Sequence, residues 1–240
     1  MTKIKSIVKV LLKPLGIGLL FVVRGFGLIR VPLLPRMLVT AHLLRSGNPG
    51  HPNKEAFENV LNNFGGVPLN IVETGTSAWG ADSTRLWDEY VKNSGGRVRS
   101  VDLRPDPSIQ LSGKLSKNTE LSIGDSVEFL QSLYDNKESV DLIYLDSYDV
   151  NWENPEPAEL HGEAEFKIAM ELARVGGIIL IDDTPTPGAA SRVGIRMSDA
   201  VLGGSPSIRG KGAKALQLVE ANPNFSILYH DYAVAIRRNY

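Results

Sequence analysis

The sequence predicts an α/β fold. We expect a doubly wound, mostly parallel sheet of seven strands with an antiparallel last strand, preceded by a helical N-terminal extension. Between residues 69 and 182, apolar strand-like runs alternate with helical runs, which is typical of parallel strands joined by helices on both faces. The last two strand-like runs are separated by almost nothing, so we expect them to form a tight antiparallel hairpin.

The body begins with an amphipathic helix and then alternates strands with helices. The first helix ends at Gly65-Gly66, and its apolar positions follow helical spacing: Phe57, Val60, Leu61 and Phe64. The predicted strands cover residues 69–73, 98–102, 120–123, 140–146, 177–182, 225–230 and 232–237. Later helices are predicted at residues 83–92, 126–134, 157–175 and 214–221. Residues 184–212, rich in Gly, Pro and Ser, are expected to form a loop over the functional edge of the sheet.

The N-terminal part of the chain differs in charge from the rest. Residues 1–54 contain nine Lys or Arg and no acid, whereas the following residues carry a net charge of about −10. We therefore expect a basic, apolar extension (residues 1–50) and one domain (residues 51–240). The acidic domain argues against a nucleic-acid surface. The absence of cysteine excludes disulfides, thiolate zinc sites and cysteine nucleophiles.

The extension has the pattern of an amphipathic helix. Apolar residues from Ile4 to Leu15 share one helical face, and Lys5, Lys9 and Lys13 lie on another. The longest uncharged run, residues 14–23, is short of the roughly 20 residues that a membrane-spanning helix needs. Three interpretations stay open: an in-plane membrane anchor, a signal peptide, and a helical arm that packs on the domain or on a second subunit.

The stretch N-I-V-E-T-G-T-S-A-W-G at residues 70–80 is the most informative motif. A strand ends in Glu73, a turn follows at Gly75, and a helix begins after Gly80; the next strand ends in Asp102. Two acids at neighbouring strand ends suit a nucleoside ligand that carries positive charge. The motif lacks the G-x-G-x-x-G pattern of dinucleotide sites, and Glu73 would repel a pyrophosphate, which disfavours an NAD-dependent oxidoreductase.

From about residue 68 to the end, the chain resembles the class I S-adenosylmethionine-dependent methyltransferases, which have a Rossmann-like sheet. The resemblance implies that Glu73 and the following loop, with Gly75, Thr76, Ser77 and Gly80, face the methionine part of the cofactor. It implies that Asp102 accepts hydrogen bonds from both ribose hydroxyls. Gly124, Asp125 and Ser126 would border the adenine, and Asp146 would also line the cofactor site. Asp125 equally fits a helix N-cap, and the two roles are compatible.

A group of carboxylates is predicted at the ends of the fourth and fifth strands. Crowded carboxylates are costly unless a cation neutralises them, and oxygen ligands suit Mg²⁺, Mn²⁺ or Ca²⁺. The pattern resembles the metal-dependent O-methyltransferases of the catechol and macrolide-sugar types, which implies the metal ligands Asp146, Asp182 and Asp183. The alternative is that Asp182 and Asp183 only cap the next turn and no metal is used.

The general base is less well defined by the sequence. The catechol-type pattern has a lysine where this chain has Asp149, so we expect Asp149 or His161 to take the proton. His161 also fits a capping or surface role. His42 and His51 could reach the same edge, and His230 is expected to be structural. The basic glycine loop Gly210-Lys211-Gly212 could cover an anionic group or serve as a hinge.

Together these features predict a methyltransferase that uses S-adenosylmethionine, with a divalent cation, to methylate a hydroxyl. The acceptor would be a sugar, a glycolipid or another small molecule, including a lipid-linked glycan. We expect a cytoplasmic protein, with peripheral attachment to the membrane through the basic extension and with oligomerisation left open. The alternatives are a metal-independent enzyme of the same fold and an inactive membrane-peripheral binding protein.

Overall fold

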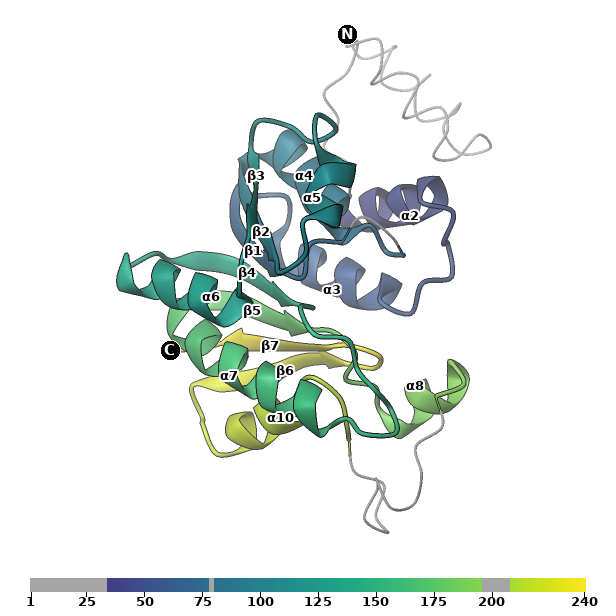
Figure 1. The fold of residues 1–240 in the computed structure, drawn as a ribbon, viewed down its shortest axis with the longest axis vertical. Coiled ribbons are helices and arrows are strands. Elements are labelled where there is room, and N and C mark those ends of the chain that lie inside the picture. Colours follow the sequence, from purple (N-terminus) through teal and green to yellow (C-terminus); the bar gives the residue numbers. More distant parts are fainter. Residues whose placement is uncertain (1–33, 78–79, 196–207) are drawn as a thin grey trace, which may run out of the picture.

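The computed structural model describes residues 34–77, 80–195 and 208–240. A seven-stranded sheet forms its centre, in the order β3-β2-β1-β4-β5-β7-β6 (Figure 1). The strands are β1 (Leu69–Thr74), β2 (Gly96–Asp102), β3 (Thr119–Ile123), β4 (Val140–Leu145), β5 (Ala173–Ile181), β6 (Phe225–His230) and β7 (Val234–Arg238). Strands β1 to β5 pair in parallel, and β7 pairs antiparallel with both β5 and β6. The predicted fold class and the terminal hairpin are confirmed.

Helices cover both faces of this sheet. They are α2 (Pro35–Arg45), α3 (Lys54–Phe64), α4 (Ser83–Ser94), α5 (Asp106–Leu111), α6 (Ser126–Asp135), α7 (Glu156–Leu172), α8 (Pro187–Arg192) and α10 (Ala213–Glu220). One apolar core joins α2, α3 and α4 to the sheet, and a second joins α6, α7 and α10 to the opposite face. Neighbouring strand residues such as Ile71 and Val72 point into different cores, as the two-residue period of a strand requires.

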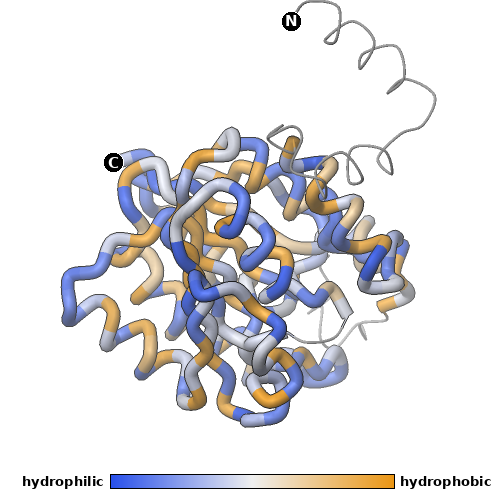
Figure 2. Tube along the Cα trace, turned by 90° about the horizontal axis from the view of Figure 1, so that it is seen from above, coloured by the Kyte–Doolittle hydropathy of each residue, from blue (hydrophilic) through white to orange (hydrophobic). Residues whose placement is uncertain are grey.

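The helix limits follow from local chemistry. Helix α3 ends at Gly65, whose φ of 63° is the left-handed conformation that glycine adopts easily. Helix α6 is N-capped by Asp125, whose carboxylate accepts hydrogen bonds from two backbone N–H groups of the first turn. Along the outer helices, apolar and hydrophilic residues alternate in Figure 2, as expected for helices with one buried face.

The structure corrects several predicted limits. Helix α7 ends at Leu172, three residues early, because Ala173 already pairs with Val140 and opens β5. The predicted loop at residues 184–212 contains helix α8, which Thr186 caps through its hydroxyl. The Pro- and Ser-containing segment after Asp102 contains the short helix α5.

Helix α2 lies within the stretch that the sequence assigns to the extension, and it is part of the packed body. Leu38, Val39 and Leu43 belong to the same core as α3 and α4. His42 is buried, and its Nε2 lies 2.8 Å from the carbonyl oxygen of Ala81, directly after the loop that ends at Gly80. The amphipathic helix predicted at residues 4–15 lies outside the described residues. Among the described helices, none has the length and apolar character needed to cross a membrane.

Candidate active site

A pocket opens at the carboxyl edge of the parallel strands, where ligands bind in sheets of this type. It is formed by residues at or just after the ends of β1, β2, β3 and β4, together with one residue of α7. They are Gly75, Val101, Asp102, Leu103, Asp125, Ser126, Ser147, Tyr148 and His161. The structure therefore brings the predicted cofactor residues Gly75, Asp102, Asp125 and Ser126, from three separate segments, to one hollow.

Gly75 allows the chain to turn tightly at the end of β1. Its φ is 81°, and a Cβ atom there would lie 2.1 Å from the backbone oxygen of Asp146. No side chain fits, so the turn needs glycine. Gly80 also has a positive φ, of 61°, but open space surrounds it, and it is not among the pocket residues.

Asp102 and Asp125 are held by backbone N–H groups and face the pocket. Asp102 is 7% exposed, and its Oδ1 accepts a hydrogen bond of 2.7 Å from the backbone N–H of Arg104. Asp125 caps α6, accepting at Oδ1 from Val127 at 2.9 Å and from Glu128 at 3.0 Å. The predicted capping role of Asp125 is confirmed, and the pocket position leaves its predicted contact to the adenine available as well.

Glu73 corrects the sequence-based prediction. Its side chain is fully buried, so it cannot touch a ligand in this arrangement. Oε1 accepts hydrogen bonds from Ser83 and Trp87, and Oε2 from Thr84 and Ser100, at distances of 2.5 to 3.0 Å. Burial raises the pKa of Glu73 to about 7, and these hydrogen bonds act against that shift. Glu73 therefore ties β1 to β2 and α4.

The loop after β1 is fastened to the same buried cluster. Thr76 is 3% exposed, and its hydroxyl lies 2.8 Å from that of Ser100. The backbone N–H of Ser77 donates to the hydroxyl of Thr84 at 2.9 Å. Thr76 and Ser77, both predicted to bind the cofactor, are thus held from the interior side of the loop.

His161, the predicted base, lies on the wall of this pocket. Its Nε2 is 3.0 Å from the hydroxyls of both Ser126 and Ser147, and its ring packs beside that of Tyr148. Its interaction with Glu165 raises the pKa of His161, and burial opposes that shift. Asp149, the other predicted base, has an exposed side chain in the segment after β4.

The three predicted metal ligands do gather at one edge, but Lys211 lies among them. Its Nζ is 2.5 Å from Oδ1 of Asp146 and 3.1 Å from Oδ2 of Asp183. Burial lowers the pKa of Lys211, and the attraction of Asp146, Asp183 and Asp182 outweighs that effect and raises it. Burial raises the pKa of Asp146, and Lys211 opposes this shift.

Two tyrosines donate to the remaining oxygens of this group. The hydroxyl of Tyr144 lies 2.6 Å from Oδ2 of Asp182 and 3.4 Å from Oδ2 of Asp146. The hydroxyl of Tyr232 donates to Oδ1 of Asp183 at 2.6 Å. The backbone N–H of Asp183 donates to Oδ1 of Asp182 at 2.7 Å. Five of the six carboxylate oxygens therefore have a protein donor within 3.1 Å, and the sixth, Oδ2 of Asp146, lies 3.4 Å from the Tyr144 hydroxyl, whose single proton goes to Asp182.

The arrangement does not fit a divalent cation as the sequence predicted. Within the described residues, no three Asp, Glu, His or Cys side chains are grouped as a metal site. An ammonium group that contacts Asp146 and Asp183 fills the position where a cation would bridge them. The prediction took a divalent metal as the cation that neutralises these acids, and it did not use Lys211.

The segment before α3 also reaches this edge. Burial lowers the pKa of His51, and the nearby charges of Asp182 and Asp183 act in the opposite direction. The side-chain amide of Asn53 lies 3.3 Å from the hydroxyl of Tyr144. His230 has the expected structural position, with Nε2 2.8 Å from the carbonyl oxygen of Thr184.

Sequence reasoning missed Lys211, Tyr144 and Tyr232 as members of the site. The signal for Lys211 was a lysine between two glycines, which was also compatible with a hinge. Tyr144 reads as an ordinary strand residue, and Tyr232 comes from a hairpin far along the chain.

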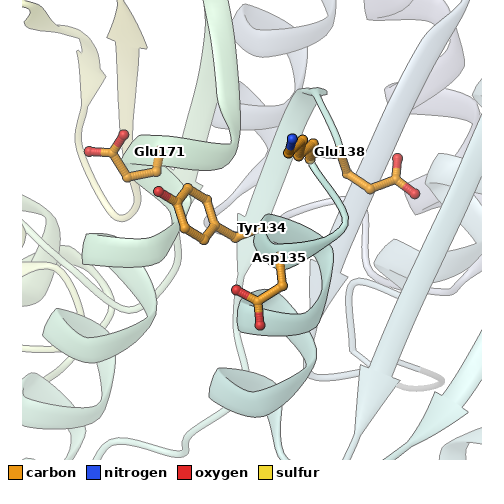
Figure 3. A pocket seen from close by; sticks show the side chains of 5 residues that line it. Tyr134, Asp135, Glu138 and Glu171 are labelled. Carbon is orange, nitrogen blue, oxygen red and sulfur yellow. The ribbon is translucent and has the colours of Figure 1, made fainter.

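A second hollow lies at the opposite edge of the sheet, near the end of α6 and the start of β4. It is lined by Tyr134, Asp135, Lys137, Glu138 and Glu171, and Figure 3 labels the tyrosine and the three acids. These side chains surround an open surface at the amino edge of the strands, so we assign the functional site to the carboxyl edge.

Comparisons with known proteins support the architecture. No family model and no curated protein matches the chain. The solved structure "MycE methyltransferase from the mycinamycin biosynthetic pathway in complex with Mg and SAH" matches with a TM-score of 0.58 and 15% identity, over 84% of this chain and 55% of that one. A second MycE structure, which also contains mycinamycin VI, matches with a TM-score of 0.56 and 15% identity, over 83% of this chain and 53% of that one. The chain spans about half the length of these structures, with which it shares the fold.

Proposed function

We propose that this protein is an S-adenosylmethionine-dependent methyltransferase. The observation that supports this most strongly is the pocket itself, where the tight turn at Gly75 meets Asp102 and the Asp125-Ser126 helix start. Backbone close to the ligand, a carboxylate for the ribose and a helix start beside the adenine suit this nucleoside. The fold shared with the MycE structures supports the same assignment.

The residues divide the work between binding and chemistry. Asp102 accepts the ribose hydroxyls, and Gly75 lets the loop approach the amino-acid part. The acids after β4 and β5 give the edge a negative potential that favours a sulfonium group. In the reaction, the acceptor oxygen bonds to the methyl carbon, and the carbon–sulfur bond breaks with its electron pair left on sulfur. The hydroxyl proton passes to a base, for which Asp149 and His161 remain the predicted residues.

For the methyl acceptor we propose a chemical class and not a particular compound. A hydroxyl on a sugar, a glycolipid or another small molecule fits an edge that is rich in carboxylates and tyrosine hydroxyls. The basic residues at the start of the chain favour an acceptor linked to a membrane. Metal assistance was part of the sequence prediction, and MycE was crystallised with Mg. Because the carboxylates here are already paired with Lys211, we derive no step through a metal.

Calorimetry with S-adenosylmethionine and with its demethylated product tests the assignment. Asp102→Ala should weaken the binding of both ligands roughly 10- to 150-fold. This is the effect of losing hydrogen bonds to a charged group that are worth about 1.5–3 kcal/mol. Asp106→Ala, an exposed acid in α5, is the control and should bind like the wild type. A wild-type chain that binds neither ligand, or that binds NADH instead, would overturn the proposal.

A further inference from the structure

We propose that Lys211 is the built-in cation of this site, and that it holds Asp146 and Asp183 side by side in place of a divalent metal. Lys211 is then a positioning residue, because it acts through the two carboxylates. The inference rests on the proposed methyltransferase function and adds that this enzyme needs no metal cofactor.

The position of the ammonium group carries the inference. Nζ contacts Asp146 after β4 and Asp183 after β5, so one cation joins the two strand ends. The Lys211 side chain is only 4% exposed, whereas the two carboxylates are each 23% exposed. The carboxylates therefore face the open edge, and the cation supports them from the interior.

The backbone around Lys211 shows that this position is built into the fold. The N–H of Lys211 donates to the carbonyl oxygen of Asp183 at 3.2 Å, so backbone and side chain bind the same turn. The N–H of Gly212 donates to the hydroxyl of Thr184 at 2.8 Å. A Cβ at Gly210 would lie 1.9 Å from the carbonyl oxygen of Asp183. The loop can approach the acidic turn this closely only because residue 210 is glycine.

Helix α7 fixes the loop from the other side. A Cβ at Gly162 would lie 2.2 Å from the carbonyl oxygen of Lys211. The loop is therefore clamped between the helix and the end of β5, and Lys211 has little freedom to leave the carboxylates. A lysine that only rests on a surface would not need glycine on both sides of its backbone.

Lys211 and the two tyrosines therefore supply most of the charge balance and hydrogen bonding of the site without a metal. Lys211 neutralises part of the charge of Asp146 and Asp183, and Tyr144 and Tyr232 supply hydroxyl donors. The residual negative charge lies beside the pocket, where a positively charged cofactor is expected. A divalent cation could enter between Asp146 and Asp183 only by displacing the ammonium group, because like charges at such short distance repel strongly.

Manganese binding to the full chain, followed by electron paramagnetic resonance, tests the inference without requiring an acceptor. The wild type should show no Mn²⁺ site. Lys211→Ala should gain one Mn²⁺ per chain, because the vacated space leaves two carboxylates that can bind a cation together with water. Lys214→Ala removes a partly exposed lysine three residues away and should gain none.

Three results would overturn the inference. One is a wild-type Mn²⁺ site that disappears in Asp146→Asn. Another is folded Lys211→Ala with no gain of Mn²⁺ binding. The third is methyl transfer by the wild type that stops in excess chelator. If Lys211→Ala fails to fold, Mn²⁺ titrations of the wild type and of Asp146→Asn still test the inference. Mn²⁺ should also restore turnover to Lys211→Ala but not to the double variant with Asp146→Asn.

Calorimetry on the same samples separates this inference from the proposed function. A wild type that binds S-adenosylmethionine and also Mn²⁺ would leave the methyltransferase assignment standing and remove the role of Lys211. A wild type that binds neither would argue against the methyltransferase assignment while leaving the pairing of Lys211 with its carboxylates intact.

Discussion

Glu73 shows how a carboxylate at a strand end can serve the scaffold. The sequence places an acid before the glycine turn, which is where a ligand contact is expected. The fold instead turns the side chain inward, where Ser83, Thr84, Trp87 and Ser100 surround it. Three of these four donors lie in the first turns of α4, so the acid fixes that helix and the loop before it.

The raised pKa of Glu73 predicts a pH-dependent stability. Its value of about 7, against an ordinary 4.5, means that the folded state retains the proton more strongly than the unfolded state. The stabilising contribution is therefore complete below pH 4.5 and is lost as the pH rises through 7, by about 3 kcal/mol in total. Glu73→Gln cannot ionise. Urea unfolding at pH 5, 6, 7 and 8 should therefore show that the free energy of unfolding falls with pH in the wild type and does not show this fall in the variant.

An exposed acid provides the comparison for that experiment. Glu120→Gln changes the same chemical group on the exposed side of β3. It should unfold with the wild-type pH profile. If Glu73→Gln and Glu120→Gln give identical profiles, the buried carboxylate does not titrate as described.

At the scale of elements, periodicity predicted those with a clear apolar pattern. All seven strands and helices α3, α4, α6, α7 and α10 were expected close to their observed limits. Helices α2, α5 and α8 were missed, because two are only six residues long and α2 lies in an apolar, basic stretch that favoured another interpretation. Short helices depend on tertiary contacts more than on local pattern.

The packing of α7 against the Lys211 loop predicts a specific glycine requirement. Gly162→Ala places a methyl group 2.2 Å from the carbonyl oxygen of Lys211, so helix or loop must move. We expect a loss of roughly 1–3 kcal/mol, which lowers Tm by about 3–10 °C in a chain of this size. Methyl transfer should fall further than the stability loss explains, because the ammonium group moves away from Asp146.

Gly188 in α8 is a matched helical glycine for this comparison. A Cβ there would meet only the hydroxyl oxygen of Thr186, at 4.0 Å. Gly188→Ala should leave Tm unchanged or raise it slightly, since alanine favours helix over glycine. Differential scanning calorimetry of both variants measures the difference. Equal melting temperatures would contradict the tight packing of α7 against the Lys211 loop.

For the whole molecule, the sequence predicted where the site lies better than how it is built. The rule that ligands bind at the carboxyl edge predicted that Gly75, Asp102, Asp125 and Asp146 lie at one edge of the sheet, and the structure places them there. It could not predict the partner of the acids, because Lys211 lies 28 residues beyond Asp183 and reaches it only through the folded loop. Side-chain pairs of this kind depend on tertiary packing, which one sequence does not encode as a visible pattern.

We expect residues 1–33 and the rest of the chain to have separable roles. Deleting residues 1–33 keeps α2, whose Leu38, Val39 and Leu43 belong to the core. The truncated chain should fold and bind S-adenosylmethionine like the full chain. It should no longer sediment with anionic vesicles, because the removed segment carries the apolar stripe and six basic residues.

Neutral vesicles provide the control for this measurement, since the full chain should bind them less than anionic ones. Equal sedimentation of the full and truncated chains with anionic vesicles would contradict a membrane role for the extension. A truncated chain that fails to fold would contradict the independence of the body.

The position of β7 between β5 and β6 has a consequence for a chain that is still being synthesised. Residues 178–181 of β5, Ile-Ile-Leu-Ile, keep one edge unpaired until residues 234–237 have left the ribosome. An apolar edge of this kind is a template for intermolecular pairing. This edge of β5 therefore stays open while residues 182–237 are being made, and stalled or C-terminally clipped chains should be clients of chaperones and proteases.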